Sequence, residues 1–421
     1  MTKWKSVFLK DILSERGYIR GPFGSALKRG EMKEQGFPVY EQQHAINGIR
    51  SFRYFIDDVK FKELERFKVE ENDLIVSCSG TVGEVSLIKE ADPKGIISQA
   101  LLILRPYQSL VLPKFLYYYF VSSNGKNSLI SRSSGSVQVN IAKREIIQGI
   151  GIPLPAIPIQ EKIVTILSSI DDKIELNLKM NETIEQMAKT LYKHWFIDFG
   201  PFKAEEFVES ELGMIPKGWE VKKLSEVVNT KYGYTESATA EEIGPHFLRI
   251  TDIQNSFISW NKVPYCTIDE KNFEKYQLHK GDIVIARTGN STGAVGYVNS
   301  TVNAVFASFL VRLQAKNDDL SSHYLYLLTT SHEYQSYIER AGIGSARKGA
   351  NAQLMTNYHI ALPPKDVMDS FHTKVDNLFE LIEKNTWENI ELKATQDYLL
   401  PRLLSGEINL ETSEKHIQEV L

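Results

Sequence analysis

The feature that most constrains the fold is the stretch from Pro158 to Phe196, whose apolar residues recur at alternating steps of three and four. This spacing is typical of an α-helix that packs along one side. The seam comprises Ile159, Ile163, Ile166, Ile170, Ile174, Ile184, Ala188, Leu191 and Trp195. Asn177 and Asn181 interrupt it where an ordinary buried face has apolar residues. Polar residues in such a seam cost stability but select register and partner.

The same pattern returns near the C-terminus, with Asn385 and Asn389 in the matching places. Its apolar positions are Val367, Phe371, Leu378, Ile382, Leu392, Leu399 and Leu403. Lys374 and Gln396 occupy two seam positions where the first copy has apolar residues. The long helix is therefore predicted to occur twice.

Start and stop signals bound both helices. Pro158 suits a first turn, Gly200-Pro201 closes the first copy and Ser405-Gly406 closes the second, while Pro401 is expected to kink or end the last turn. Each helix spans roughly 38 residues, or about 57 Å. A lone helix of this length leaves its apolar stripe in water, so we expect the two copies to pair as an antiparallel coiled coil.

The segments before the helices also repeat, at an offset of about 209 residues. Short β-like runs are expected at Leu74–Ser77, Val85–Ile88 and Ile96–Leu104, and a buried aromatic helix at Lys114–Val121. The matching pairs are Asp73-Leu74-Ile75-Val76 with Asp282-Ile283-Val284-Ile285, Gly80 with Gly289, Leu116-Tyr117 with Leu325-Tyr326, and Gly135-Ser136 with Gly344-Ser345. By contrast, Gly21–Ser25 and Gln42–His44 have no clear echo in the second half. One scaffold is thus expected to carry two different surfaces.

Composition narrows the class of protein. With 421 residues and 42% hydrophobic content, the chain is long enough for two or more domains, and its net charge of −4 leaves phosphate binding open because four glutamates gather between residues 205 and 211. It has no run of eighteen apolar residues and no apolar start typical of a secretion signal, so we expect a cytoplasmic protein without membrane contact. Cys78 and Cys266 support neither a disulfide framework nor a zinc site.

Motifs for catalysis are missing from the sequence. The turns Ser79–Gly83 and Thr288–Gly293 lack the Gly-Lys-Ser/Thr of a P-loop, there is no Asn-Pro-Pro-aromatic motif for adenine methylation, and His44, His246 and His359 are scattered singly. No metal-ligand cluster is predicted. The polar loops at 135–140 and 344–351 carry amide and basic side chains of the kinds that bond base edges or the DNA backbone.

Taken together, an ordered set of segments resembles the specificity subunit of type I restriction-modification enzymes. They are Gly21-Pro22-Phe23-Gly24-Ser25 with Lys28; Ile152-Pro153-Leu154-Pro155 before Gln160-Glu161; Glu209-Ser210-Glu211-Leu212-Gly213 with Ile215-Pro216-Lys217-Gly218-Trp219; Phe247-Leu248-Arg249-Ile250-Thr251-Asp252-Ile253; Ala286-Arg287-Thr288-Gly289; and Leu403-Leu404-Ser405-Gly406-Glu407-Ile408. The resemblance covers nearly the whole chain.

The resemblance implies an α+β fold with two target recognition domains, each reading half of a split DNA site, and two long helices that act as a ruler. The expected boundaries are 1–155 for the first recognition domain, 156–200 for its helix, 201–364 for a linker and the second domain, and 365–421 for the second helix and tail. The implied partners are double-stranded DNA, modification subunits that methylate adenine using S-adenosylmethionine, and restriction subunits that use ATP and Mg²⁺. No cofactor or metal is expected in this chain.

The candidate DNA-binding residues lie in the polar turns and loops of the two recognition domains, and no catalytic residue is expected. They are Ser25, Lys28, Gln42, Gln43, His44, Gln138, Asn140, Lys143, Thr235, Arg249, Thr251, Arg287, Thr288, Asn290, Arg347, Lys348 and Asn351. Helix register is assigned to Asn177, Asn181, Asn385 and Asn389.

Two other classes of protein compete with this interpretation. A stand-alone DNA-modifying enzyme would need paired acids such as Asp57-Asp58 or Asp171-Asp172 to act, although both pairs are typical of solvated surface or helix charges. A coiled-coil adaptor that binds only protein would show no salt-sensitive binding to DNA.

Overall fold

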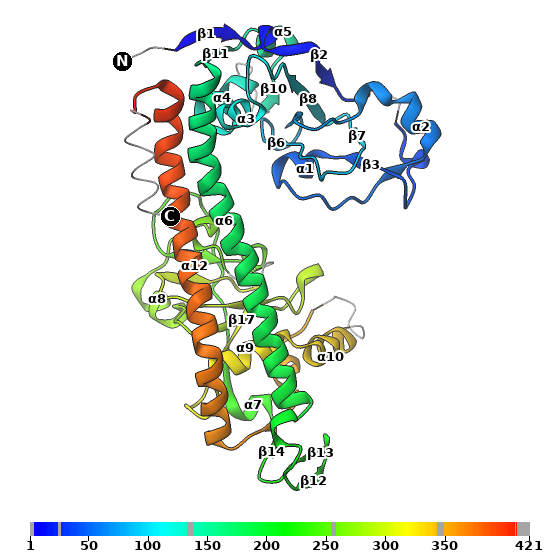
Figure 1. Cartoon of the computed structure of the whole chain (residues 1–421). Helices are drawn as coiled ribbons and strands as arrows, with labels where there is room; N and C mark the ends of the chain where they lie inside the picture. Colours follow the sequence, from blue (N-terminus) through cyan, green and yellow to red (C-terminus); the bar gives the residue numbers. More distant parts are fainter. Residues whose placement is uncertain are drawn as a thin grey trace. The chain divides into compact units, whose positions relative to one another are not determined.

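The computed structural model (Figure 1) describes residues 4–23, 27–132, 139–253, 258–342, 349–408 and 410, with the backbone alone at 131, 132, 139, 140 and 342. The chain divides into two compact units. Unit 1 comprises residues 1–173 and 392–421, and unit 2 comprises residues 174–391. The predicted boundaries follow the chain repeat, whereas each compact unit contains a segment of both long helices.

Unit 1 is built on a four-stranded sheet in the order β2-β8-β5-β6, with strands Leu13–Arg20, Leu101–Pro106, Leu74–Ser77 and Val85–Leu87. A second sheet has the order β4-β3-β7 (Phe55–Ile56, Phe37–Tyr40, Ile96–Ile97), in which β3 and β7 run parallel. Two antiparallel pairs complete the strands: β1 (Lys5–Phe8) with β11 (Gly151–Leu154), and β9 (Ile130–Arg132) with β10 (Val139–Ile141). The helices are α1 (Gln42–Ile46), α2 (Asp58–Glu63), α3 (Pro113–Val121), α4 (Ser123–Leu129) and α5 (Arg144–Gln148).

Unit 2 repeats this plan. Its four-stranded sheet has the order β15-β20-β17-β18 (Val228–Tyr232, Leu310–Ala315, Ile283–Ala286, Val295–Tyr297), and β16 (His246–Leu248) pairs in parallel with β19 (Ala304–Phe306). Strand β14 (Glu220–Lys223) pairs with β21 (His359–Leu362), and the hairpin β12 (Phe207–Ser210) and β13 (Gly213–Pro216) precedes them. The helices are α7 (Leu224–Val227), α8 (Glu270–Tyr276), α9 (Ser322–Thr330), α10 (His332–Gly342) and α11 (Ala352–Thr356).

The expected single run from Ile96 to Leu104 is wrong, because the structure divides it into β7 and β8 in different sheets. The polar residues Ser98 and Gln99 form a turn between the strands, closed by the bond from Leu101 N–H to the Ser98 carbonyl at 3.1 Å. The aromatic helix is confirmed as α3, which buries Phe115, Leu116, Tyr118, Tyr119 and Phe120. Its side chains therefore belong to the core and do not form a stacking platform for bases.

The two long helices are α6 (Ile157–Tyr192), continued by a π-helical turn at Lys193–Ile197, and α12 (Lys365–Ser405). Pro401 does not end α12, because a proline in the last turn removes little of the remaining hydrogen bonding. Gly406, at φ 73°, closes the helix instead. Lys374 was placed on the seam, but it is exposed and Val375 takes the buried position.

Within unit 2, the asparagines of α6 and α12 form two side-chain pairs. The Asn177 amide donates to Oδ1 of Asn389 at 2.9 Å, and the Asn385 amide donates to Oδ1 of Asn181 at 2.8 Å. Numbering increases along one helix and decreases along the other, so the helices are antiparallel, as predicted. Asn177 also donates to Glu388 at 2.7 Å. The four residues thus set the register by hydrogen bonding in a largely buried seam.

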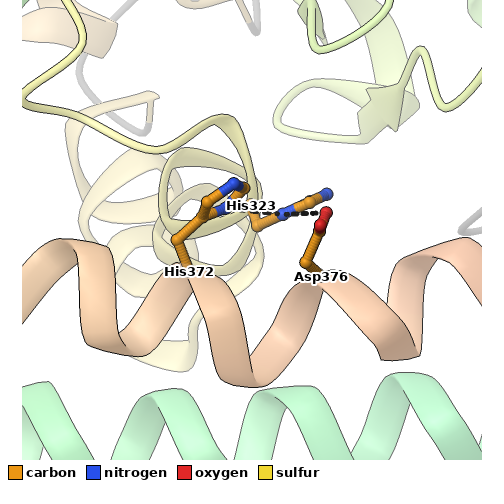
Figure 2. Close-up of side chains that lie close together, drawn as sticks. All are labelled: His323, His372 and Asp376. Atoms are coloured by element: carbon orange, nitrogen blue, oxygen red, sulfur yellow. Dashed lines mark hydrogen bonds and ion pairs between the residues drawn. The ribbon is translucent and has the colours of Figure 1, made fainter.

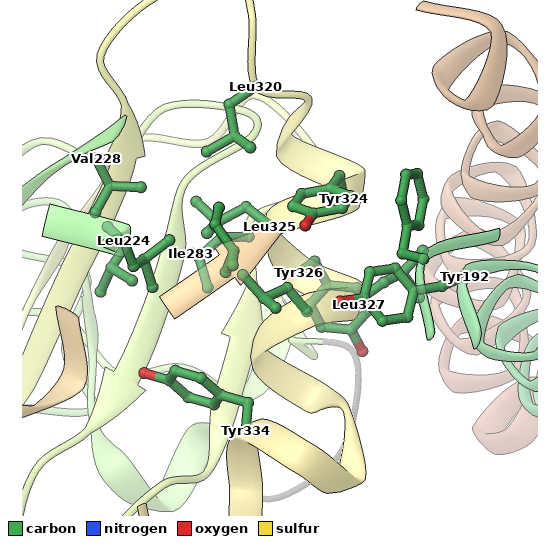
Figure 3. Close-up of a cluster of buried hydrophobic side chains, with 14 of the residues drawn as sticks. Tyr192, Leu224, Val228, Ile283, Leu320, Tyr324, Leu325, Tyr326, Leu327 and Tyr334 are labelled. Atoms are coloured by element: carbon green, nitrogen blue, oxygen red, sulfur yellow. The ribbon is translucent and has the colours of Figure 1, made fainter. Parts of the chain in front are cut away.

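The largest core of unit 2 joins the recognition domain to the helix pair (Figure 3). It includes Tyr192 of α6, Tyr324 and Leu327 of α9, and Phe371 of α12, all buried. The ring centroids of Tyr192 and Tyr324 lie 5.5 Å apart. Unit 1 has its own core between its two sheets, with Val39, Ile75, Ile97 and Ile103 at its centre. In unit 2, therefore, helix and recognition domain form one packed body.

Candidate nucleic-acid interface

In unit 1, the ends of three strands converge on the segment Ser98–Leu101. Ser98 N–H donates to the Tyr40 carbonyl at the end of β3 (2.8 Å), and Cys78 N–H, after β5, donates to the Ala100 carbonyl (2.8 Å). Gly21 N–H, after β2, donates to the Leu101 carbonyl (3.0 Å). Backbone bonds alone therefore gather the turns that follow β2, β3 and β5.

Unit 2 contains the same three bonds, around the segment Ala307–Leu310. Ala307 N–H donates to the Leu248 carbonyl (2.9 Å), Arg287 N–H to the Phe309 carbonyl (3.0 Å), and Gly233 N–H to the Leu310 carbonyl (3.3 Å). The turns after β15, β16 and β17 converge as their counterparts do in unit 1. We call each convergence the strand-end surface: 20–23, 41–43 and 78–80 around 98–101 in unit 1, and 232–235, 249–251 and 287–290 around 307–310 in unit 2.

Glycine is required where the turn after the first sheet strand crosses this segment. A Cβ on Gly21 would lie 2.0 Å from the Ser98 carbonyl oxygen, and one on Gly233 would lie 2.3 Å from the Ala307 carbonyl oxygen. The two glycines are equivalent in the fold, so the expectation that Gly21–Ser25 has no echo in the second half is wrong. The shared feature is one glycine in otherwise different sequences, which a comparison of residues does not detect.

Amide side chains dominate one hollow of the strand-end surface in unit 1. The hollow, about 360 Å³, is lined by Glu41, Gln42, Gln43, Ile46, Asn47, Arg53, Ser98 and Ala100. Gln43 and Asn47 are exposed, while the Gln42 amide donates to the backbone oxygens of Ser79 and Thr81 and so holds the glycine turn. Arg53 makes two 2.8 Å bonds to Glu41. Asn47 is a functional candidate that sequence reasoning missed.

A second hollow of unit 1, about 370 Å³, is basic. It is lined by Tyr18, Arg20, Ile141, Ala142, Lys143 and Arg144. Lys143 and Arg144 are exposed, and the Arg144 guanidinium lies 5.0 Å from the centre of the Tyr18 ring. Nη1 of Arg20 is buried and has no hydrogen-bond partner in the part of the chain that the structure describes. The sequence analysis named Lys143 but missed Arg20 and Arg144, which are single basic residues on a strand and a helix.

Both units hold an arginine at the same corner of the strand-end surface, on different strands. By strand register, Arg20 corresponds to Tyr232, since Arg20 pairs with Leu102 and Tyr232 with Val311, and Cys78 corresponds to Arg287. In unit 1 burial raises the pKa of Cys78 to about 12, although the neighbouring Arg20 opposes this. In unit 2 the Arg287 guanidinium lies 4.9 Å from the Tyr232 ring centre. The cation and its neighbour are exchanged between the two copies.

In unit 2, the predicted residues Thr235, Arg249, Thr251, Arg287, Thr288 and Asn290 all lie on the strand-end surface. Thr235, Thr251 and Asn290 are exposed. Arg249 is half-buried and its guanidinium binds Asp252 at 2.9 and 3.0 Å, which raises the pKa of Arg249. Thr288 forms a β-bridge with Gly349, so the chain that follows the loop at 343–348 returns beside this surface.

Two predicted residues have structural roles instead. His44 is fully buried, accepts from Glu41 N–H at 2.6 Å, lies 2.9 Å from the Ser51 carbonyl, and stacks on Phe52. It cannot reach DNA in this fold, so assigning it to DNA contact is wrong. Asn351 is exposed, but its Oδ1 caps α11 by accepting from Leu354 N–H at 2.8 Å.

The remaining candidates are less constrained. Lys28 is exposed at the start of the short turn Arg29–Glu31, outside the strand-end surface as defined. Asn140 lies in β10, where only its backbone is described. Ser25, Gln138, Arg347 and Lys348 lie outside the described residues.

The paired acids of the enzyme alternative also have structural roles. Asp57 caps α2 by accepting from Lys60 N–H at 2.9 Å, and Asp58 is exposed. Asp171 accepts from the Tyr118 hydroxyl at 2.6 Å and from Gln396 at 2.5 Å, while Asp172 is exposed. Burial raises the pKa of Cys266 to about 11, and with Cys78 similarly raised neither thiol is an activated nucleophile. The part of the chain that the structure describes has no helix long and apolar enough to cross a membrane.

A duplicated fold with a variable surface on each copy is the architecture of a modular recognition protein. The family model for the type I restriction modification DNA specificity domain matches residues 1–186 and 216–394, one match for each half. The chain belongs to this family. It is accordingly a non-catalytic DNA sequence-recognition subunit, and neither the stand-alone enzyme nor the protein-only adaptor is favoured.

Individual relatives agree with this membership. The chain is 31% identical over 315 residues to the type I restriction enzyme MjaIX specificity subunit of Methanocaldococcus jannaschii, covering 72% of this chain and 70% of that protein. It is 26% identical over 416 residues to the MjaVIII specificity subunit of the same organism, covering 97% and 93%. The crystal structure of a type I restriction-modification S subunit from M. genitalium shares the fold, with a TM-score of 0.52, 15% identity and coverage of 95% and 96%.

Proposed function

We propose that each strand-end surface reads one half of a bipartite DNA sequence. The observation that carries this proposal is the repeated framework of three backbone bonds, which supports different side chains in the two units. Backbone bonds place no demand on side-chain identity, so the surface is free to vary while the fold remains constant. Two independent surfaces in one chain fit a target with two separate parts.

The side chains divide into two roles by their chemistry. Exposed amides and hydroxyls, namely Gln43, Thr251 and Asn290, suit hydrogen bonding to base edges. The cations Lys28, Lys143 and Arg144 are exposed and suit contact with phosphates. Arg287 is half-buried against Tyr232, a fixed position from which a guanidinium can reach either a guanine edge or the backbone.

Partner subunits supply the chemistry in this proposal. Modification subunits methylate adenine with S-adenosylmethionine, and restriction subunits translocate and cut using ATP and Mg²⁺, with the complex located in the cytoplasm. Membership of the specificity family supports these assignments. The two long helices are proposed to fix the gap between half-sites, supported by the paired asparagines that determine their register.

Alanine substitution of Arg287 and Gln43 tests the assignment, with each variant assembled with its modification subunits. Loss of a base contact by Gln43→Ala should relax one position of one half-site by about 1 to 3 kcal/mol, whereas loss of a phosphate contact should weaken binding evenly and reduce its salt dependence. The measurement is binding to a panel of single-base variants of the DNA site at several salt concentrations.

Arg66→Ala is the matched control for Arg287→Ala. Arg66 also lies over an aromatic ring, 4.3 Å from the centre of Phe67, but before β5 begins and away from the strand-end surface. We expect it to bind DNA normally. If Arg287→Ala and Gln43→Ala also retain full affinity and specificity with an intact fold, the strand-end surface is not the reading surface.

A further inference from the structure

Three potential metal ligands meet where α9 of unit 2 begins beside α12. His323 is the second residue of α9, and His372 and Asp376 lie one helical turn apart on α12. Figure 2 shows His372 and Asp376 on the same helix, with His323 approaching from α9. Residues at i and i+4 share a helix face, so α12 presents both of its ligands to the same point. His323 is buried, and the other two are half-buried.

The distances between these side chains match a tetrahedral site. Nδ1 of His323 lies 3.3 Å from Nδ1 of His372 and 3.9 Å from Oδ1 of Asp376, and all three ligand atoms lie within 4.8 Å of one another. Zn²⁺ binds imidazole nitrogen at about 2.0 to 2.1 Å in tetrahedral geometry, which places two ligand atoms about 3.3 Å apart. The imidazole pair already has this separation, and the carboxylate needs a shift of about half an ångström on the same geometry.

Asn299 provides an independent indication of a ligand. It is 3% exposed, it lines the same hollow of about 190 Å³, and neither its amide nitrogen nor its oxygen has a hydrogen-bond partner in the described structure. A buried primary amide without partners is costly, and native structures rarely retain one. A metal-bound water in this hollow would donate to Oδ1 of Asn299 and complete the fourth coordination position.

The surroundings favour a cation. Asp376, Glu380 and Glu383 line the hollow, and Lys280 is the one basic side chain among its lining residues. Lys280 is engaged with Glu383 at 2.6 Å. Burial lowers the pKa of His323 to about 4, aided by the neighbouring His372, so near neutral pH this imidazole keeps a free nitrogen lone pair. Imidazole with carboxylate selects zinc-class ions over Mg²⁺ or Ca²⁺, which prefer oxygen ligands.

We propose that His323, His372 and Asp376 bind one divalent cation of the zinc class, with Asn299 hydrogen-bonded to a water on that ion. The ion ties α9 of the second recognition domain to α12. It is a structural clamp, because its ligands come from the packed interior side of the helix and not from the strand-end surface. The sequence analysis expected no metal site, since 48 residues separate His323 from His372 and no local motif joins them.

Zinc binding by the untagged full-length chain tests this proposal. After removal of metal with a chelator, titration against a chromophoric competitor should show one Zn²⁺ per chain, and Zn²⁺ but not Mg²⁺ should raise the melting temperature. His372→Gln and Asp376→Asn should each weaken Zn²⁺ binding by more than about 100-fold. Absence of saturable binding at one equivalent would overturn the proposal.

Matched controls come from the same region of unit 2. Asp369→Asn, on α12 and exposed beside Lys365, and His332→Gln, exposed on α10, should leave Zn²⁺ binding unchanged. Equal binding by the His372 and Asp376 variants and these controls would place the ion elsewhere and refute the site. If a ligand variant does not fold, the Co²⁺ spectrum of the unaltered chain decides: strong tetrahedral d–d absorption supports the site, and its absence overturns it.

Discussion

The Asn385 side chain donates a hydrogen bond to Oδ1 of Asn181 at 2.8 Å, joining two helices whose paired residues are 204 positions apart in the chain. Asn181 is equivalent by the repeat to Asn389, and Asn385 to Asn177, so each pair joins non-equivalent members of the two copies. This crosswise pairing is what a twofold relationship between antiparallel helices requires. Any slip by one turn sets an amide against apolar side chains.

Replacement of one partner should therefore cost more than replacement of both. Asn181→Leu leaves the largely buried Asn385 amide without its partner, and we expect a loss of about 1 to 3 kcal/mol of stability. Asn181→Leu with Asn385→Leu should be less destabilised than the sum of the single variants, with a coupling of about 0.5 to 3 kcal/mol. Urea unfolding followed by circular dichroism measures the difference, with the exposed Glu182→Leu as control. Additive losses would show that the pair does not determine register.

The close approach at Gly233 gives a second prediction. In Gly233→Ala the new Cβ meets the Ala307 carbonyl oxygen at 2.3 Å, so the turns must separate, at a cost of about 1 to 3 kcal/mol. Recognition of one half-site should weaken while the other is retained. Gly30→Ala is the control, because no heavy atom lies within 4 Å of its added Cβ. Binding to DNA with either half-site altered checks the result, and an equal loss for both halves would contradict it.

Periodicity predicted the helices well because burial along one side leaves a regular trace in the sequence. The asparagines were recognisable as exceptions to that trace. Lys374 was misplaced because α12 turns its buried face toward the core of unit 2, where Val375 and Phe379 pack. The run from Ile96 to Leu104 was read as one strand because two buried strands separated by three residues have continuous apolar character.

The candidate site was less predictable. Its framework consists of backbone bonds, which leave almost no signal except a glycine such as Gly21. Gln43 and Arg287 were found by composition, whereas Arg20 and Asn47 were missed because nothing in their neighbours marks them. His44 was wrongly included because a polar residue beside two glutamines gives no sign of its burial.

The ruler role of the helices predicts a specific effect of insertion. Beyond Ile184, α6 packs into the core of unit 2 through Ala188 and Tyr192, so an insertion there would damage the recognition domain. We therefore place four residues in each helix, between Lys173 and Ile174 and between Glu391 and Leu392, where the compact units divide. The change amounts to about 6 Å and 40°. We expect a spacer longer by one to two base pairs with both half-sites unchanged, because B-DNA advances about 3.4 Å per base pair.

Mapping of methylated adenines checks the insertion variant. An active complex that retains the original spacer would show that the helices do not set the gap. A variant with Asn181 and Asn385 intact should keep its register within unit 2, so loss of all activity with a normal melting profile would also count against the ruler.

The central claim is that each recognition domain reads its half-site independently, and a domain exchange measures this most directly. Residues 232–364 carry the whole strand-end surface of unit 2, and we exchange them for the matching segment of a relative with a different target. Sequencing of methylated adenines in cells that carry the modification subunits should show one half-site replaced, with the other half and the spacer unchanged. Replacement of both half-sites, or of neither in an active complex, would contradict the account.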